Sequence, residues 1–312
     1  MRHIWSEALN KSILDFSGHG KRKTWFSLSF IFNDLRSSKI AAHPCAARTA
    51  ELISGSLAIC LLMFSGAHAF AAVQGEEITY QSGGVSMRGY IAWDDAVKGK
   101  RPGVLVVHEW WGHNDYARKR ARMLAEMGYT ALAVDMYGDG KQAHHPDDAG
   151  KMSSAVGKDL PLSQKRFDAA RAALVKHASV DPKRIAAIGY CFGGTVVLQM
   201  ARAGEALKGV AIFHGNLATA TPAKPGGVKA RVLVLTGADD PFVPPDQIET
   251  FKKEMDAAGA KYEVIVYPGA KHSFTNTDAD AYGRQFNMPL AYNESADRES
   301  WAALKKFLQD VM

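Results

Sequence analysis

The residue in this chain best suited to chemistry is a cysteine held between glycines. Cys191 stands in the hexapeptide GYCFGG at positions 189–194, after an apolar run at 184–188 and before a helix-permissive run at 195–202. A strand, a tight turn and a helix with a nucleophile at the apex form a nucleophile elbow, which projects the apical side chain above the sheet. The pattern therefore predicts a thiol nucleophile.

The neighbours of the cysteine fit this interpretation. Side chains at Gly189 and Gly193 would clash with the turn, and the absence of one at Gly194 lets the helix pack closely. The free N–H groups of the new helix favour negative charge, either on the sulfur or on an oxyanion beside it. The alternative is a buried structural cysteine in an ordinary turn between a strand and a helix.

A thiol nucleophile needs a base, and the base needs a group that orients it. Asp239 and Asp240 follow one apolar strand, and His272 follows another. The chain order nucleophile, acid, histidine is that of the α/β-hydrolase fold. Taken singly, the acids could be a turn or capping pair and the histidine an exposed loop residue. Three such residues in this order, each after a strand, would rarely coincide by chance.

Strands alternate with helices around these residues. Predicted strands are 77–81, 85–93, 103–108, 130–137, 184–189, 210–214, 231–237 and 263–267. Predicted helices are 115–127, 146–157, 162–177, 195–202, 245–258 and 295–311. The first two strands read as a hairpin, and the later apolar strands as a buried parallel sheet. The sequence therefore predicts an α/β-hydrolase fold over residues 73–312, with a mostly parallel central sheet and helices on both faces.

From about residue 76 to its end, the chain resembles the dienelactone hydrolase family of cysteine-dependent α/β-hydrolases. The matching pieces are the elbow and the segments VVHEWWG (106–112), DDPFVP (239–244) and GAKHSF (269–274). The resemblance implies a triad of Cys191, Asp240 and His272, and it selects Asp240 over Asp239.

The resemblance also implies roles around the triad. Glu109 would contact the resting thiol, and a carboxylate there disfavours the thiolate, giving a protonated, oxidation-resistant resting state. The oxyanion would be held by backbone N–H groups, one expected from Phe192 after the nucleophile and the other, by resemblance, from Trp110. The expected substrate pocket is lined by Trp111, Tyr137, Ser273 and Phe274. The alternative for Trp110 and Trp111 is that both are core residues.

Two features of these segments limit what can be predicted about the substrate and about a metal site. Dienelactone enzymes of the family hold a substrate carboxylate with two arginines, but here residues 138–141 read GDGK and position 276 is Asn. The resemblance thus implies the chemistry without fixing the substrate. The segment HEWWGH (108–113) is no zinc-protease motif, because Gly112 stands where the second histidine would be and the segment follows a strand.

The first 72 residues differ in character from the rest. An apolar run at 52–64 follows basic residues and precedes small residues at alternate positions, which is typical of a signal peptide; a membrane anchor is the lesser alternative. Residues 1–71 hold eight basic and four acidic residues, so cleavage there would reduce the net charge from +6 to about +2. Cys45 and Cys60 would also be lost, leaving Cys191 as the one thiol of an exported, periplasmic or secreted protein.

The sequence therefore predicts a hydrolase of small-molecule esters or lactones, acting through an acyl-enzyme on Cys191 without a cofactor or metal. No basic stripe suggests nucleic acid, and no stable membrane association is expected after leader cleavage. The alternative from another class is a non-catalytic binding or thiol redox-sensing domain on the same fold. A sensor thiol would need neither the acid nor the histidine. Peptidase activity is a third option, for which no propeller or lid domain is evident.

Overall fold

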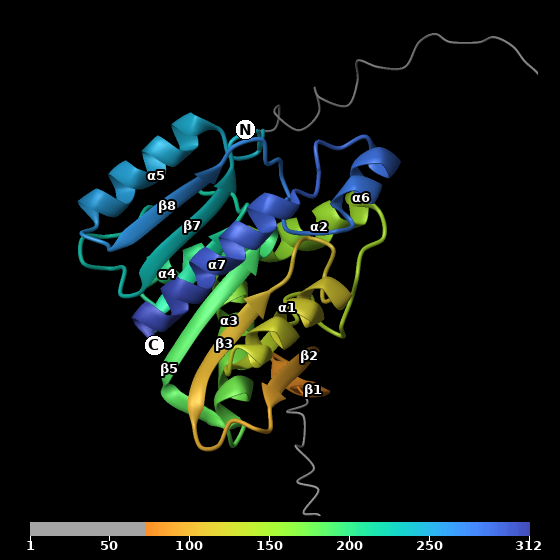
Figure 1. The fold of residues 1–312 in the computed structure, drawn as a ribbon, viewed down its shortest axis with the longest axis vertical. Helices are drawn as coiled ribbons and strands as arrows, with labels where there is room; N and C mark the ends of the chain where they lie inside the picture. Colours follow the sequence, from red (N-terminus) through yellow and green to blue (C-terminus); the bar gives the residue numbers. More distant parts are fainter. Residues whose placement is uncertain (1–72) are drawn as a thin grey trace, which may run out of the picture. The chain divides into compact units, whose positions relative to one another are not determined.

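An eight-stranded sheet organises residues 73–312, the part of the chain that the computed structural model describes (Figure 1). The strand order is β1-β2-β4-β3-β5-β6-β7-β8. The strands are β1 (Val73–Ser82), β2 (Val85–Asp94), β3 (Arg101–Val107), β4 (Thr130–Val134), β5 (Val180–Tyr190), β6 (Gly209–Phe213), β7 (Arg231–Gly237) and β8 (Tyr262–Tyr267). The predicted leader in residues 1–72 lies outside the described residues.

The sheet is antiparallel at one edge and parallel elsewhere. β1 pairs with β2, and β2 with β4, in antiparallel registers. The steps from β4 through β3, β5, β6 and β7 to β8 are all parallel. The hairpin turns at Gly83 and Gly84, both with positive φ, a conformation that glycine adopts without strain. Because parallel strands end at the same edge, the loops after β3, β5, β6, β7 and β8 meet there.

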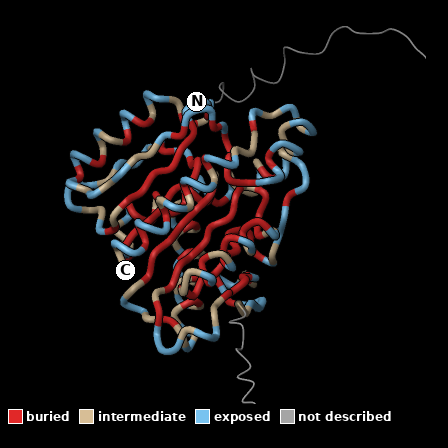
Figure 2. The backbone as a smooth tube through the Cα atoms, viewed as in Figure 1, coloured by how far each residue is buried: buried red, intermediate tan, exposed pale blue. Residues whose placement is uncertain are grey.

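Helices cover both faces of the sheet, as the alternation of elements predicted. They are α1 (Asp115–Glu126), α2 (Pro146–Gly157), α3 (Leu160–Lys176), α4 (Phe192–Arg202), α5 (Pro245–Ala257), α6 (Ala279–Phe286) and α7 (Glu294–Val311). One face packs against α2, α3, α4 and α5, and the other against α1 and α7. Alternate residues of each central strand enter the two cores, so these strands are buried on both sides (Figure 2).

Several elements differ from the prediction at their ends: β1 begins at Val73 and β5 at Val180, each four residues earlier than predicted. Two further differences have a local cause. β4 ends at Val134, three residues early, because the Asp135 carboxylate accepts hydrogen bonds from the N–H groups of Tyr137, Gly138 and Gly140 and curls the chain away from the sheet. The helix α6 was not predicted at all. It has eight residues, with a glycine at position 283, which leaves too little apolar periodicity to detect.

No helix within residues 73–312 combines the length and the apolarity needed to cross a membrane. The two cores of residues 73–312 are formed where the helices pack on the faces of the sheet. That sheet brings the predicted chemical residues to one edge.

Candidate active site

Cys191 occupies the sharp turn between β5 and α4. Its backbone has φ 52° and ψ −115°, in a region that L-residues rarely adopt, and its N–H donates to the carbonyl of Phe213 at 3.0 Å. A Cβ on Gly189 would lie 2.1 Å from the Gly193 carbonyl oxygen, and one on Gly193 would lie 2.2 Å from that of Val107. Both obstacles are backbone atoms. The elbow can thus exist only with glycine at these positions, as the sequence predicted.

Strained backbone gathers around this turn. The non-glycine residues with positive φ among those described include Cys191, His214 and Ser273, which follow β5, β6 and β8. Residues held in this region cost free energy and persist where their surroundings enforce the conformation. Their concentration at the carboxyl edge of the sheet marks that edge as a candidate site.

His272 and Asp240 meet beside the elbow. The Nδ1–H of His272 donates to Asp240 Oδ2 at 2.8 Å, and the Phe242 N–H donates to Oδ1 of the same carboxylate at 2.8 Å. Both side chains are buried, whereas Asp239 is exposed. His272 also lies near Cys191, since the charge of that residue contributes to the pKa of the imidazole. The fold thus brings the three residues that the sequence predicted as a triad together at the carboxyl ends of β5, β7 and β8.

The surroundings of His272 favour its charged form. Burial alone would lower the pKa of this imidazole, but the charge of Cys191 and the hydrogen bond and charge of Asp240 outweigh burial and raise the pKa to about 10. A histidine held in its charged form is able to deliver a proton to a leaving group.

Glu109 is buried at the end of β3, with its carboxylate turned toward the loop that carries His272. Ser273 Oγ donates to Oε1 at 2.8 Å and Asn276 Nδ2 donates to Oε2 at 2.6 Å. Burial raises the pKa of this carboxyl, and the two hydrogen bonds and the charge of His272 offset part of that rise. The contact between Glu109 and the resting thiol implied by the resemblance is not among these contacts. In this conformation the carboxylate is held by the base-bearing loop.

The two backbone groups predicted to hold an oxyanion border the elbow. Phe192 is the first residue of α4, where an N–H has no acceptor within its own helix. The first turn of α4 packs on the end of β3, since a Cβ on Gly193 would meet the carbonyls of Val107 and His108. Within the described part of the chain, the Trp110 N–H donates to no protein acceptor. Within residues 73–312, neither N–H thus has a hydrogen bond to the protein.

The predicted pocket residues divide into two groups. Tyr137 and Ser273 lie in the site. The Tyr137 hydroxyl donates to the Trp110 carbonyl at 2.9 Å, and its pKa is raised first by burial and then by the charge of Cys191. The Ser273 hydroxyl donates to the Glu109 carboxylate. Trp111 and Phe274 are buried in packing clusters. Trp111 stacks on Tyr282 of α6 with ring centroids 4.5 Å apart.

Phe274 packs against Tyr267 and against His214, with ring centroids 5.5 and 5.3 Å apart, and it belongs to the core under α1 and α7. Its side chain is fully buried. The structure thus places Phe274 beneath the His272 loop, as a support for that loop, rather than on an open wall of a pocket. Ser273, the residue before it, has a positive φ of 58°.

A buried polar network behind the His272 loop was not predicted from the sequence. Arg120 of α1 donates to the Thr275 carbonyl and to Asp297 Oδ1, both at 2.6 Å. The Thr275 hydroxyl meets the Tyr116 hydroxyl at 2.6 Å and His214 Nε2 at 2.8 Å. The one signal in the sequence was an arginine on the otherwise apolar face of α1. Such a residue, when buried, must be paired.

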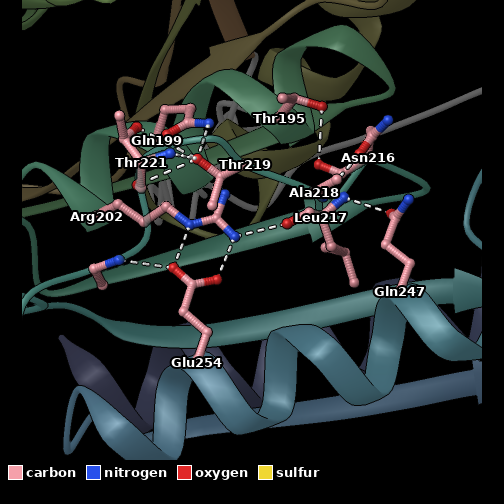
Figure 3. A network of polar contacts seen from close by, with 11 residues as sticks. Thr195, Gln199, Arg202, Asn216, Leu217, Ala218, Thr219, Thr221, Gln247 and Glu254 are labelled. Atoms are coloured by element: carbon pink, nitrogen blue, oxygen red, sulfur yellow. Dashed lines mark hydrogen bonds and ion pairs between the residues drawn. The ribbon is translucent and has the colours of Figure 1, made fainter. Parts of the chain in front are cut away.

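A second network fixes the loop after β6, beside the elbow (Figure 3). Arg202 of α4 binds Glu254 of α5 through two hydrogen bonds of 2.8 and 2.7 Å and donates to the Leu217 carbonyl at 2.6 Å. The Thr195 hydroxyl donates to the Asn216 carbonyl at 3.1 Å. This loop is thereby tied to α4, the helix that begins directly after Cys191. Across residues 73–312, no group of three or more His, Cys, Asp or Glu is arranged to hold a metal ion.

Comparison with known proteins places this arrangement in context. The sequence model of the dienelactone hydrolase family matches residues 87–312. The chain is 32% identical over 208 residues to a Yersinia pestis protein named "Putative carboxymethylenebutenolidase", covering 64% of this chain and 78% of that protein. It is 32% identical over 234 residues to a Bradyrhizobium protein named "Probable 2-oxo-3-(5-oxofuran-2-ylidene)propanoate lactonase", covering 70% of this chain and 90% of that protein.

Solved structures agree with the sequence comparison. The crystal structure of a dienelactone hydrolase-like promiscuous phosphotriesterase from metagenomic libraries matches with a TM-score of 0.72 and 34% identity, covering 77% of this chain and 99% of that one. An esterase of Thermogutta terrifontis, at 18% identity and a TM-score of 0.56, shares the fold. The α/β-hydrolase fold predicted from the alternation of strands and helices is thus confirmed.

Proposed function

Because the chain belongs to the dienelactone hydrolase family, whose members hydrolyse esters and lactones, we propose that it cleaves such bonds in small molecules through a Cys191–His272–Asp240 triad. The observation that carries the proposal is the convergence of these three side chains at the carboxyl edge of the sheet. The strained elbow aims the thiol, and the 2.8 Å contact with Asp240 orients the imidazole. Relatives named as a butenolidase and a lactonase support the class of bond.

The reaction proceeds in two halves. The Cys191 thiolate attacks the carbonyl carbon, and the electron pair of the C=O bond moves to oxygen, where the N–H groups of Phe192 and Trp110 stabilise the oxyanion. When the C=O bond re-forms, the C–O bond to the leaving alcohol breaks, and His272 gives that oxygen its proton. A thioester on Cys191 remains. In a lactone, the released alcohol stays attached to the acyl group.

Hydrolysis of the thioester regenerates the enzyme. His272, now neutral, takes a proton from water, whose oxygen attacks the acyl carbon. The second tetrahedral intermediate occupies the same two N–H groups. Its collapse expels the Cys191 thiolate and releases the carboxylic acid. Asp240 fixes the imidazole tautomer in both halves and stabilises its charged form.

Glu109 has a place in this cycle as a group that changes partners. Its carboxylate is held by Ser273 and Asn276, which keeps it off the thiol in the arrangement that favours the Cys191–His272 ion pair. A resting form in which Glu109 turns to Cys191 instead would hold the thiol protonated and less open to oxidation. This two-state behaviour stays a prediction of the family resemblance.

Residues 73–312 act as a single catalytic domain in this proposal, and residues 1–72 serve as an export leader. The leader's apolar run and small-residue cleavage pattern support an exported, periplasmic or secreted enzyme. Expression of the full chain in a Gram-negative host, followed by N-terminal sequencing of the periplasmic protein, tests this. A mature N-terminus near residue 70 is expected, and an intact N-terminus at Met1 would contradict it.

A substrate panel tests the activity. Purified residues 73–312 should hydrolyse small activated esters and five-membered lactones, and both Cys191→Ala and prior alkylation of the thiol should reduce the rate to background. If no compound reacts above background while peroxide oxidises Cys191 stoichiometrically, the thiol redox-sensing alternative is favoured instead. If the Ala variant keeps full activity, Cys191 is not the nucleophile.

A further inference from the structure

The carbonyl of the Glu109–Trp110 peptide, beside the elbow, accepts hydrogen bonds from two donors. The carbonyl of Glu109 accepts a hydrogen bond from His108 Nδ1 at 2.5 Å and another from the Gly112 N–H at 3.2 Å. The N–H of this same peptide unit belongs to Trp110. Because N–H and C=O point in opposite directions across a planar trans peptide, fixing the carbonyl fixes the direction of the N–H.

The hydrogen-bond donors and acceptors around His108 settle its tautomer. The Met136 N–H donates to His108 Nε2 at 3.2 Å, so Nε2 must be the unprotonated acceptor. Nδ1 therefore carries the proton and donates it to Glu109. The ring is fully buried, and burial lowers its pKa, which keeps the imidazole neutral. Both nitrogens are committed, one to each neighbouring loop.

We propose that His108 is a positioning residue for the oxyanion: its Nδ1–H holds the Glu109–Trp110 peptide so that the Trp110 N–H points at the reacting carbonyl. The inference rests on the proposed function, to which it adds a residue that touches neither substrate nor thiol. Two donors on one carbonyl also polarise the peptide, and hydrogen bonds that share a peptide unit strengthen one another. The Trp110 N–H thereby becomes a better donor to developing negative charge.

The neighbouring contacts place this peptide beside the nucleophile. A Cβ on Gly193 would lie 2.6 Å from the His108 carbonyl oxygen, so the first turn of α4 touches the segment directly. The His108 ring lies against the Phe192 ring, with centroids 5.8 Å apart. The Tyr137 hydroxyl holds the next carbonyl, that of Trp110, at 2.9 Å. The two carbonyls that flank the Trp110 backbone are thus both restrained.

Two amide substitutions distinguish the hydrogen bond made by His108 Nδ1 from the one made by Nε2. In His108→Asn the side-chain amide lies near the position of Nδ1 and can still donate to Glu109. In His108→Gln the amide reaches the position of Nε2, where its oxygen can accept from Met136 but no donor reaches Glu109. The pair is matched in polarity and burial, and it differs in the one hydrogen bond that the proposal invokes.

Three measurements distinguish a loss of oxyanion stabilisation from a general disruption of the site. Hydrolysis of an activated ester and inhibition by a trifluoromethyl ketone, which forms a tetrahedral oxyanion on the thiol, both need the oxyanion donors. Alkylation of Cys191 by iodoacetamide does not. We expect the Gln variant to lose roughly 10- to 100-fold in kcat/KM, below the loss for a deleted donor, with a matching loss of ketone affinity. Its alkylation rate should stay within about twofold of wild type, and the Asn variant should retain most of its activity.

Equal losses in hydrolysis and alkylation, or equal behaviour of the Asn and Gln variants, would overturn the proposal. Should the variants not fold, ¹⁵N NMR of wild-type histidines decides it, since an Nδ1–H tautomer that persists across the neutral pH range is expected and an Nε2–H tautomer would refute it. Failure of the proposed function looks different: the wild type would then neither hydrolyse the ester nor bind the ketone.

Discussion

The two flanks of Cys191 are held in place by different kinds of contact. On the nucleophile side, α4 lies against the strand ends with backbone touching backbone, and glycines at 189 and 193 make that approach possible. On the base side, the loop that carries His272 is held by side chains from distant elements. Glu109 and Ser273, which hydrogen-bond each other, are 164 residues apart, and Arg120 reaches Thr275 across 155.

The difference in contacts implies that the elbow is rigid, whereas the side chains that hold the His272 loop can change partners. Backbone contacts through glycine leave little room for another arrangement, so the Cys191 turn and the first turn of α4 keep one geometry. A carboxylate held by two neutral donors can exchange them for other partners at modest cost, because each such hydrogen bond to a charged group contributes only about 1.5 to 3 kcal/mol net. The proposed mechanism thus combines a fixed nucleophile with a base-side network that has room to switch.

Replacement of an elbow glycine is expected to have the largest effect. In Gly193→Ala the new methyl group would meet the Val107 carbonyl at 2.2 Å, and neither side can move without breaking the sheet. The free energy of unfolding should fall by more than about 4 kcal/mol. The matched control is Gly150→Ala in α2, where a Cβ meets nothing within 4 Å and stability should rise by up to about 1 kcal/mol. Chemical denaturation measures both; equal stabilities would contradict a rigid elbow.

The second-largest effect is expected from removal of the Asp240 carboxylate, which orients the His272 imidazole in the proposed mechanism. Asp240→Asn should lower kcat/KM by roughly 10²- to 10⁴-fold. Asp240 helps raise the pKa of His272 to about 10, so its loss lowers that pKa. The proposed mechanism requires the imidazolium, so its activity is lost as pH rises through that pKa. The alkaline limb of the pH–rate profile should therefore move to lower pH in the variant. Exposed Asp239→Asn is the control and should match the wild type in both respects.

The buried arginine tests the base side directly. Arg120→Met leaves the Thr275 carbonyl and Asp297 without their donor, which should cost about 3 kcal/mol of stability. It should also reduce kcat/KM, because the His272 loop loses an anchor. Arg118→Met removes an ion pair with Glu77 in which both side chains are partly exposed, and should cost no more than about 1 kcal/mol. Similar costs for the two variants would mean that Arg120 is not a support for the loop.

The smallest expected effect concerns the hold on Glu109. Ser273→Ala removes one of its two donors, and the freed carboxylate should visit the thiol more often. Iodoacetamide should then alkylate Cys191 roughly tenfold more slowly, as loss of about 1.5 kcal/mol implies. Adding Glu109→Gln should restore the rate. A slow double variant would show that Ser273 acts through something other than the charge of Glu109.

The same contrast explains what the sequence could predict. The elbow, the order of strands and helices, and the positions of Cys191 and His272 depend on local patterns, namely glycines in a turn and apolar runs of strand length. Those patterns left Asp239 and Asp240 as alternatives, and the family resemblance selected Asp240. The contacts of Glu109, the inward turn of Phe274 and the helix α6 depend on residues brought together by the fold. An eight-residue helix with two apolar anchors, Tyr282 and Phe286, carries no periodicity of its own until Trp111 packs against it.

The most direct test of the central claim is the mass of the enzyme during turnover. Wild-type protein mixed with an activated butyrate ester and quenched within the first turnover should gain the mass of one butyryl group, located on Cys191 by peptide mapping. Cys191→Ala, mixed and quenched identically, should gain none. Hydrolysis without an acyl adduct on Cys191, or with the adduct on another residue, would contradict the account.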